Sequence, residues 1–157
     1  MKRLLLTLAM LFPVLAMAGP LQPLAASDIA TFLKPPAHGE RIIALWALNC
    51  AYCESNLEAL AKLQRAHPRD LGLVMLPTDG IERRQAISAR LRHMKMDGHS
   101  NRAYADAAPE RLNFLLDPSW GGETPRVLLI RADGSRLGIS GQLPLAQLHK
   151  IFPDHSM

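Results

Sequence analysis

The feature that most constrains this 157-residue chain is a pair of cysteines, Cys50 and Cys53, at the boundary between two different sequence patterns. The apolar run 42–46 before them is typical of a strand that is covered on both faces. Residues 54–63 after them have the apolar spacing of a helix. This places the first sulfur at a helix N-terminus, where free N–H groups and the helix dipole favour a thiolate, and the second about one turn on. The C-x-x-C therefore predicts a redox pair.

Residues 1–18 match a secretory signal peptide: two basic residues, a mostly apolar stretch at 4–14, and an A-M-A cleavage site that ends at Ala18. An uncleaved membrane anchor is the alternative. However, the apolar stretch is shorter than the roughly 20 residues that span a bilayer. We therefore expect a periplasmic protein, cleaved after Ala18, whose residues 19–157 form one domain.

Two other roles for the cysteines remain open. A purely structural Cys50–Cys53 disulfide would close a very short loop and would therefore remove little conformational entropy from the unfolded chain. The chain is also long enough to build a hydrophobic core without a disulfide. A zinc site needs about four ligands, and the chain has no second C-x-x-C and no H-x-x-x-H. Both arguments favour the redox pair, and we predict no metal ligands.

The charge balance gives no sign of a nucleic-acid partner. Loss of the two basic signal residues leaves 16 Lys+Arg (18 minus 2) against 14 Asp+Glu, a net charge of +2. The basic residues are scattered along the chain and form no patch.

Strand and helix patterns alternate through the rest of the chain, after an irregular entry segment at 19–25. The predicted strands are 41–47, 71–76, 112–116, 126–130 and 136–140. The predicted helices are 27–33, 54–66, 81–94, 101–108 and 145–152. This alternation predicts an α/β fold with a mixed central sheet flanked by helices, closed by an antiparallel hairpin at the Asp133-Gly134 turn.

Two motifs in this order resemble those of the exported thioredoxin-like thiol–disulfide oxidoreductases of the TlpA/ResA/DsbE-like family. The first is W-A-L-N-C-A-Y-C at 46–53; the second is G-E-T-P-R-V-L-L-I-R-A-D-G at 122–134, followed by G-Q-L at 141–143. The resemblance covers roughly residues 40–157. It implies the thioredoxin fold, with a helical insert between the half that carries the cysteines and the half that carries the proline.

The resemblance also implies roles for individual residues. Cys50 would be the exposed nucleophile and Cys53 the buried resolving cysteine. Thr124-Pro125 would form a cis peptide beside them, and the backbone of Thr124 would pair with an extended substrate. The remaining substrate-binding residues would be aromatic.

Those aromatic residues are Trp46, expected to pack beside the cysteine pair, and Tyr52, expected to contact the partner. The implied partners are exported proteins with dithiols or disulfides and a membrane thiol protein that donates electrons. No cofactor is expected beyond the Cys50–Cys53 disulfide itself.

The sequence departs from its relatives at the usual proton acceptor for the buried thiol. Thioredoxin has an acid at the position of Ala44, and ResA-like proteins have a glutamate at the position of Asn56. Glu54 and Glu58 lie nearby in sequence, but we expect them to be solvated acids on the helix surface.

The residues between the cysteines give one indication of the direction of electron flow. Strongly oxidising relatives carry a histidine there, whereas this chain has Ala51-Tyr52. A C-x-Y-C with threonine before the proline is similar to the DsbC/DsbG isomerases, which dimerise through a separate domain for which this chain has no room. We therefore expect a monomeric reductant of exported disulfides, with an oxidase or isomerase as alternatives.

A copper-binding or copper-delivery protein is the alternative of a different class. His93, Met94, Met96 and His99 bring two thioethers and two imidazoles close together in sequence, and such soft ligands suit copper. Copper-delivery relatives of this fold, however, use C-x-x-x-C, not C-x-x-C.

Overall fold

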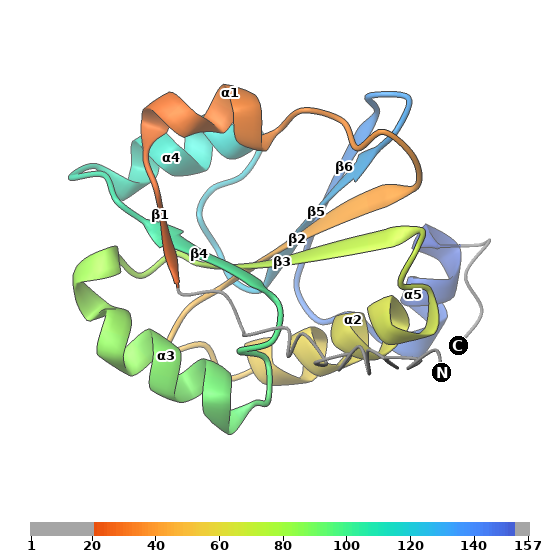
Figure 1. Cartoon of the computed structure of the whole chain (residues 1–157), viewed down its shortest axis with the longest axis horizontal. Helices are drawn as coiled ribbons and strands as arrows, with labels where there is room; N and C mark the ends of the chain where they lie inside the picture. Colours follow the sequence, from red (N-terminus) through yellow and green to blue (C-terminus); the bar gives the residue numbers. More distant parts are fainter. Residues whose placement is uncertain (1–20, 153–157) are drawn as a thin grey trace, which may run out of the picture.

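The computed structural model describes residues 21–152, which form a six-stranded sheet with helices on both faces (Figure 1). The spatial order is β1-β4-β3-β2-β5-β6; the first four strands are parallel, and β5 and β6 run antiparallel to their neighbours. The strands are β1 Gln22–Leu24, β2 Glu40–Trp46, β3 Leu71–Pro77, β4 Ser100–Tyr104, β5 Arg126–Arg131 and β6 Arg136–Ser140.

The helices divide between the two faces of the sheet. Figure 1 shows α1 and α4 on one face and α2, α3 and α5 on the other. They are η1 Ala26–Asp28, α1 Ile29–Phe32, α2 Cys53–Ala66, η2 Ile81–Arg83, α3 Arg84–His93, α4 Pro109–Leu116 and α5 Leu145–Ile151. The α/β class and the mixed sheet predicted from the sequence are confirmed.

Strand β2 lies inside the sheet, between β3 and β5, and is buried on both faces as its unbroken apolar run predicts. Ile42, Ala44 and Trp46 point into the core beneath α2, α3 and α5. Ile43 and Leu45 point into the second core, beneath α1 and α4. The chain leaves the end of β2 directly into the cysteine segment, so the two cores fix where that segment begins.

The closing hairpin has the predicted geometry. Strand β5 pairs antiparallel with β6, and Gly134 in the turn has a φ of 87°. The left-handed region is open to glycine without a Cβ clash, which explains the Asp-Gly pair at this turn.

The prediction of a helix at 101–108 is wrong, because residues 100–104 form strand β4. This strand pairs with β3 on one side and with β1 on the other. Both partners are distant in sequence, and β1 lies within the segment predicted to be irregular. The segment between the cysteine half and the proline half is therefore not purely helical: it adds a strand to the sheet.

The prediction of a strand at 112–116 is also wrong, because residues 109–116 form helix α4. Pro109 is at the start of the helix, where its fixed φ is favourable and its missing N–H costs nothing. Leu112 and Leu116, one turn apart, are buried, whereas Phe114 between them is exposed. A short apolar run does not by itself distinguish a strand from a buried helix.

No helix within residues 21–152 is long and apolar enough to cross a membrane. The predicted signal peptide, 1–18, lies outside the described residues.

Because residues 109–116 form a helix, substitutions at Leu112 and Phe114 should differ in their effect on stability. Leu112→Ala should lower the unfolding free energy by about 2–5 kcal/mol, because Leu112 is 0% exposed. Phe114→Ala should cost well under about 1 kcal/mol, because Phe114 is 61% exposed. Urea unfolding of the two variants measures the difference; similar losses would contradict the helix, since a strand places both side chains on one face.

Candidate redox site

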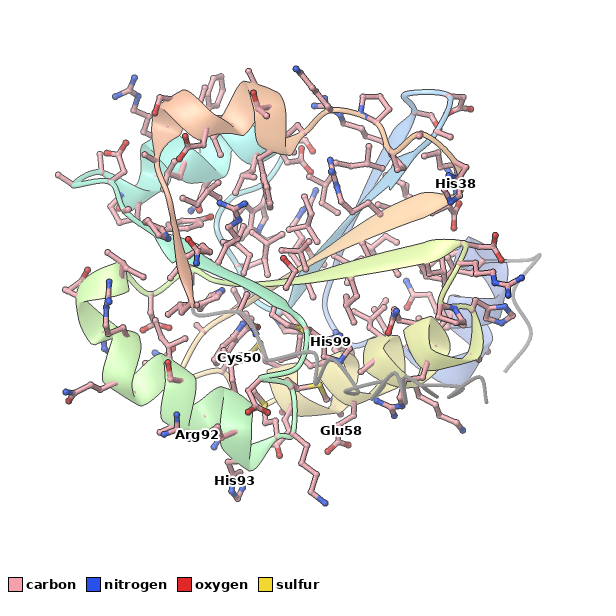
Figure 2. The ribbon with its side chains drawn as sticks, viewed as in Figure 1. His38, Cys50, Glu58, Arg92, His93 and His99 are labelled. Carbon is pink, nitrogen blue, oxygen red and sulfur yellow. A yellow bond between two sulfur atoms is a disulfide. The ribbon has the colours of Figure 1, made fainter. Side chains whose placement is uncertain are left out.

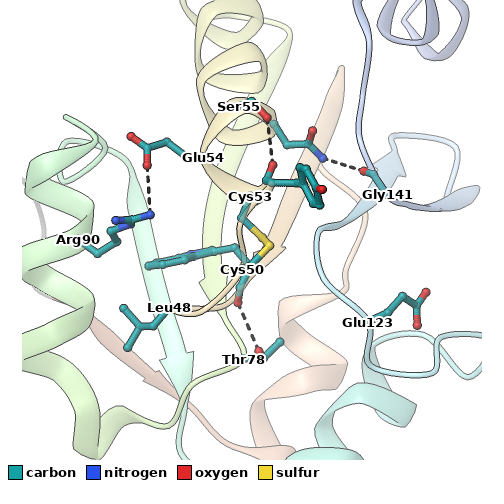
Figure 3. Close-up of a disulfide and its surroundings, with 12 residues drawn as sticks. Leu48, Cys50, Cys53, Glu54, Ser55, Thr78, Arg90, Glu123 and Gly141 are labelled. Carbon is teal, nitrogen blue, oxygen red and sulfur yellow. Dashed lines mark hydrogen bonds and ion pairs between the residues drawn. A yellow bond between two sulfur atoms is a disulfide. The ribbon is translucent and has the colours of Figure 1, made fainter.

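Cys50 and Cys53 form a disulfide, with their Cα atoms 5.5 Å apart (Figure 3). Cys50 is partly exposed, whereas Cys53 is 2% exposed and belongs to the core beneath α2. Helix α2 begins only at Cys53, with Tyr52 as its N-cap. Cys50 therefore lies in the turn that directly precedes the helix, and its N–H donates to the carbonyl of Ala47 (3.1 Å).

The segment between β2 and the disulfide is held by the residues that follow β3. The backbone N–H of Thr78 donates to the carbonyl of Trp46 (2.8 Å), and the N–H of Leu48 donates to Oδ2 of Asp79 (2.8 Å). The other oxygen of Asp79 pairs with Arg83. Sequence reasoning missed these residues, although the signal was present: β2 and β3 are parallel neighbours, so their carboxyl ends lie at the same edge of the sheet.

Asn56 joins the first turns of α2 to the chain that follows β6. Its side-chain Nδ2 donates to the carbonyl of Gly141 (2.8 Å), and its Oδ1 accepts the N–H of Leu143 (2.9 Å). The side chain is 3% exposed, and it carries no titrating group. Asn56, at the position where a glutamate was considered, is therefore a neutral link between two backbone segments, and Ala44 is buried in the core and supplies no acid either.

The two glutamates near the cysteines lie on the surface of α2. Glu54 pairs with Arg90 of α3 at 3.2 Å, and both side chains are partly exposed (Figure 3). Glu58 is exposed on the next turn (Figure 2). Neither is a buried proton acceptor for Cys53 in this arrangement.

The Thr124–Pro125 peptide bond is cis. Pro125 is buried, and its carbonyl accepts the N–H of Gly141 (2.9 Å), which links this loop to the same glycine that Asn56 holds. Thr124 is partly exposed, and no hydrogen bond joins its backbone to any residue between 21 and 152. The backbone of Thr124 is thus free to pair with another chain.

A buried arginine directly after Pro125 organises the residues around this loop. Arg126 is 7% exposed; it pairs with Asp117 and donates to the hydroxyl of Ser140 (2.7 Å). Burial by itself would raise the pKa of Asp117, but hydrogen bonds from Ser119 and Arg126 outweigh burial and lower it below the usual value. The sequence signal was an arginine at the start of an otherwise apolar strand, where only a partnered charge is tolerated.

Gly138 on the neighbouring strand leaves the space for this ion pair. A Cβ at Gly138 would collide with the guanidinium of Arg126 and the carboxylate of Asp117. The backbone of β6 can therefore approach the pair closely only because residue 138 has no side chain.

The two aromatic residues predicted to bind substrate lie in different environments. Tyr52 is 59% exposed beside the disulfide, where a partner can reach it. Trp46 is 1% exposed, because its position on β2 directs it into the core beneath α2. Trp46 therefore supports the site from the core that it shares with Cys53, and a substrate contact at Trp46 stays a prediction.

The residues proposed for copper are not presented together at the surface. Met94 and Met96 are 6% and 3% exposed and belong to the hydrophobic core. His93 is exposed at the end of α3 and points outward in Figure 2. Among residues 21–152, no group of three or more His, Cys, Asp or Glu is placed to hold a metal ion.

No protein-family model matches the chain, and no curated protein matches it in sequence. Solved structures do match in fold. A secreted Mycobacterium tuberculosis disulfide oxidoreductase homologous to Escherichia coli DsbE has a TM-score of 0.55 and 16% identity over 74% of this chain and 81% of its own. A thioredoxin-family thiol:disulfide interchange protein from Chlorobium tepidum has 0.59 and 18%, covering 80% and 83%.

StoA from Bacillus subtilis has a TM-score of 0.53 and 16% identity, covering 74% of this chain and 84% of its own. These similar structures are thiol–disulfide oxidoreductases of the DsbE/ResA/StoA/TlpA type, or thioredoxin-family proteins. At such identities the likeness establishes the fold. This chain has the thioredoxin fold, with a C-x-x-C disulfide at the end of β2.

The role of Asn56 as a link between α2 and the 141–143 segment can be measured. Asn56→Ala should lower the unfolding free energy of the oxidised protein by about 1–3 kcal/mol, because it leaves backbone groups of Gly141 and Leu143 without their partner. Glu58→Ala, an exposed change on the same helix, is the control and should stay within about 0.5 kcal/mol. Equal urea midpoints for the two variants would show that the link is not stabilising.

The lowered pKa of Asp117 predicts a pH dependence of stability. The folded-state pKa lies below the unfolded value of about 3.9, so the carboxylate contributes its full stability above that value and loses it as the pH falls through the folded-state pKa. Asp117→Asn should therefore show a smaller loss of unfolding free energy between about pH 6 and about pH 3 than the unmodified protein. The exposed change Asp97→Asn should retain the unmodified slope; the same slope in Asp117→Asn would refute the assignment.

Proposed function

We propose that this protein is a periplasmic thiol–disulfide oxidoreductase that reduces disulfides of exported proteins. The observation that carries the proposal is the pairing of a partly exposed Cys50 with a buried Cys53, in a fold where the free backbone of Thr124 is available for a substrate chain. A buried cysteine cannot be reached by a protein disulfide, so the exposed one must make the first contact.

The reaction is two successive thiol–disulfide exchanges. In the reduced protein, the Cys50 thiolate attacks one sulfur of the substrate disulfide, forms a mixed disulfide and releases the other substrate sulfur as a thiolate. The Cys53 thiolate then attacks the Cys50 sulfur, forms the Cys50–Cys53 disulfide and releases the second substrate thiolate. Two electrons pass from the protein dithiol to the substrate, and the two released thiolates take up protons.

The substrate would bind as an extended peptide beside the disulfide. The unpaired backbone of Thr124 supplies hydrogen bonds in the manner of strand addition, and exposed Tyr52 supplies apolar contact. Pro125 shapes this loop from a buried position, and Trp46 supports the site from the core.

The reductive direction rests on the chemistry between the cysteines. Ala51-Tyr52 contributes no histidine to stabilise the Cys50 thiolate, so the reduced form is not favoured as it is in strong oxidants. The cycle requires no cofactor beyond the disulfide, but it requires a membrane thiol protein that reduces Cys50–Cys53 again. We propose that the protein works as a monomer.

The periplasmic location rests on the A-M-A site that ends at Ala18. It also has a parallel in the M. tuberculosis protein of similar fold, which is secreted. The first 18 residues would be removed on export, leaving residues 19–157 as the working domain.

The reduction potential of the Cys50–Cys53 pair tests the direction. Equilibration against glutathione buffers, followed by alkylation of free thiols, should give about −250 mV or lower, as a reductase requires. Cys53→Ser should accumulate a mixed disulfide with a substrate, and Cys50→Ser should accumulate none, because only Cys50 is exposed enough to attack. A potential near −120 mV would indicate an oxidase and overturn the reductive direction.

A further inference from the structure

Charged residues around the disulfide form three clusters, of which two are neutral and one is not. On one side, Glu54 of α2 pairs with Arg90 of α3 (Figure 3). Behind the turn that leads to Cys50, Asp79 pairs with Arg83. Each of these clusters has one acid and one base and is neutral.

The third cluster carries an excess negative charge. It contains two acids, Asp117 and Glu123, and one base, Arg126. Arg126 is buried against Asp117 in direct contact, whereas its distance to Glu123 Oε1 is 3.7 Å. The side chain of Glu123 is 55% exposed, so the unbalanced charge faces solvent on the opposite side of the disulfide from Glu54 (Figure 3).

Glu123 is held in position through both its backbone and its side chain. Its carbonyl accepts the indole N–H of Trp120 (2.8 Å), and its carboxylate accepts the hydroxyl of Ser140. The hydrogen bond from Ser140 is the main cause of a lowered pKa at Glu123, so the group is charged at neutral pH. A fixed carboxylate loses less side-chain entropy on binding a partner than a free one would.

Glu123 also immediately precedes the residue whose backbone is free to bind substrate. A peptide that pairs with Thr124 places its neighbouring residue opposite Glu123, where cross-strand side chains lie about 5 Å apart. Opposite charges at such positions attract and like charges repel, and the effect weakens as salt is added.

We infer that Glu123 is a specificity-determining residue that selects substrate peptides with a lysine or arginine close to the reacting cysteine. The inference rests on the proposed function, because it needs a peptide that pairs with Thr124. It adds the substrate class: basic segments of disulfide-bonded proteins, reduced by the same two exchanges at Cys50 and Cys53.

The test compares three disulfide-linked peptides that differ only at the residue next to the cysteine: lysine, glutamine or glutamate. The reduced full-length protein should reduce the lysine peptide with a kcat/KM about fivefold above that of the glutamate peptide at low ionic strength, with the glutamine peptide between them. High salt should compress this ratio towards one.

Two variants test whether the carboxylate of Glu123 causes the preference for the lysine peptide. Glu123→Gln should bring the lysine-to-glutamate ratio close to one, and Glu123→Lys should reverse it. Glu58→Gln removes an exposed glutamate from α2 and should keep the original ratio. A loss of structure would lower the kcat/KM for all three peptides together and would not reverse their order. A reversed order in Glu123→Lys therefore shows that the charge at residue 123 causes the preference.

The outcomes separate the two proposals. Reduction of all three peptides at equal rates, or an unchanged ratio in Glu123→Lys, would overturn the selection by Glu123 and leave the reductase function standing. No reduction of any peptide would overturn both, because the proposed function then fails at its own chemistry.

Discussion

Burial of β2 on both faces is the constraint on which the rest of the molecule depends. The strand is hydrogen-bonded to β3 on one side and to β5 on the other, and its side chains alternate between two hydrophobic cores. If a strand held in this way shifted by one residue, each of its side chains would move from one hydrophobic core to the other, so its register is fixed. Its last residue, Trp46, therefore fixes where the C-x-x-C segment starts.

The site itself depends on hydrogen bonds between segments that are far apart in sequence. Asp79 holds the backbone at Leu48, and Asn56 holds Gly141, whose N–H in turn holds Pro125. These contacts connect the cysteine turn, helix α2 and the proline loop to one another. Most of them engage backbone groups, so they position the disulfide and the Thr124 loop without adding any group that reacts with thiols.

The buried pair of Arg126 and Asp117 has a different consequence. Because the pair neutralises itself away from solvent, the adjacent Glu123 keeps its own charge at the surface. The same arginine thus supports the proline loop and leaves a carboxylate beside it unbalanced. A charge in this place can act on the choice of substrate without touching the sulfur chemistry.

The elements that sequence analysis predicted well are those whose signals are local. The C-x-x-C, the apolar run of β2 and the Asp133-Gly134 turn each depend on a few adjacent residues. The segment of α4 was predicted as a strand because its apolar run is short and fits either element. The segment of β4 was predicted as a helix because nothing local marks it as a strand: β4 exists through its pairing with the distant strands β1 and β3.

The sequence by itself determined the chemistry of this protein: two cysteines at redox spacing, an α/β fold and a proline loop at the start of the closing hairpin. It could do so because strand and helix periodicity, turn residues and thiol spacing act over a few residues. Only the tertiary structure decided that Asn56 joins α2 to residues 141–143 and that Glu123 carries the unbalanced charge beside Thr124. Those properties arise from contacts between segments up to 87 residues apart, and no local pattern records them.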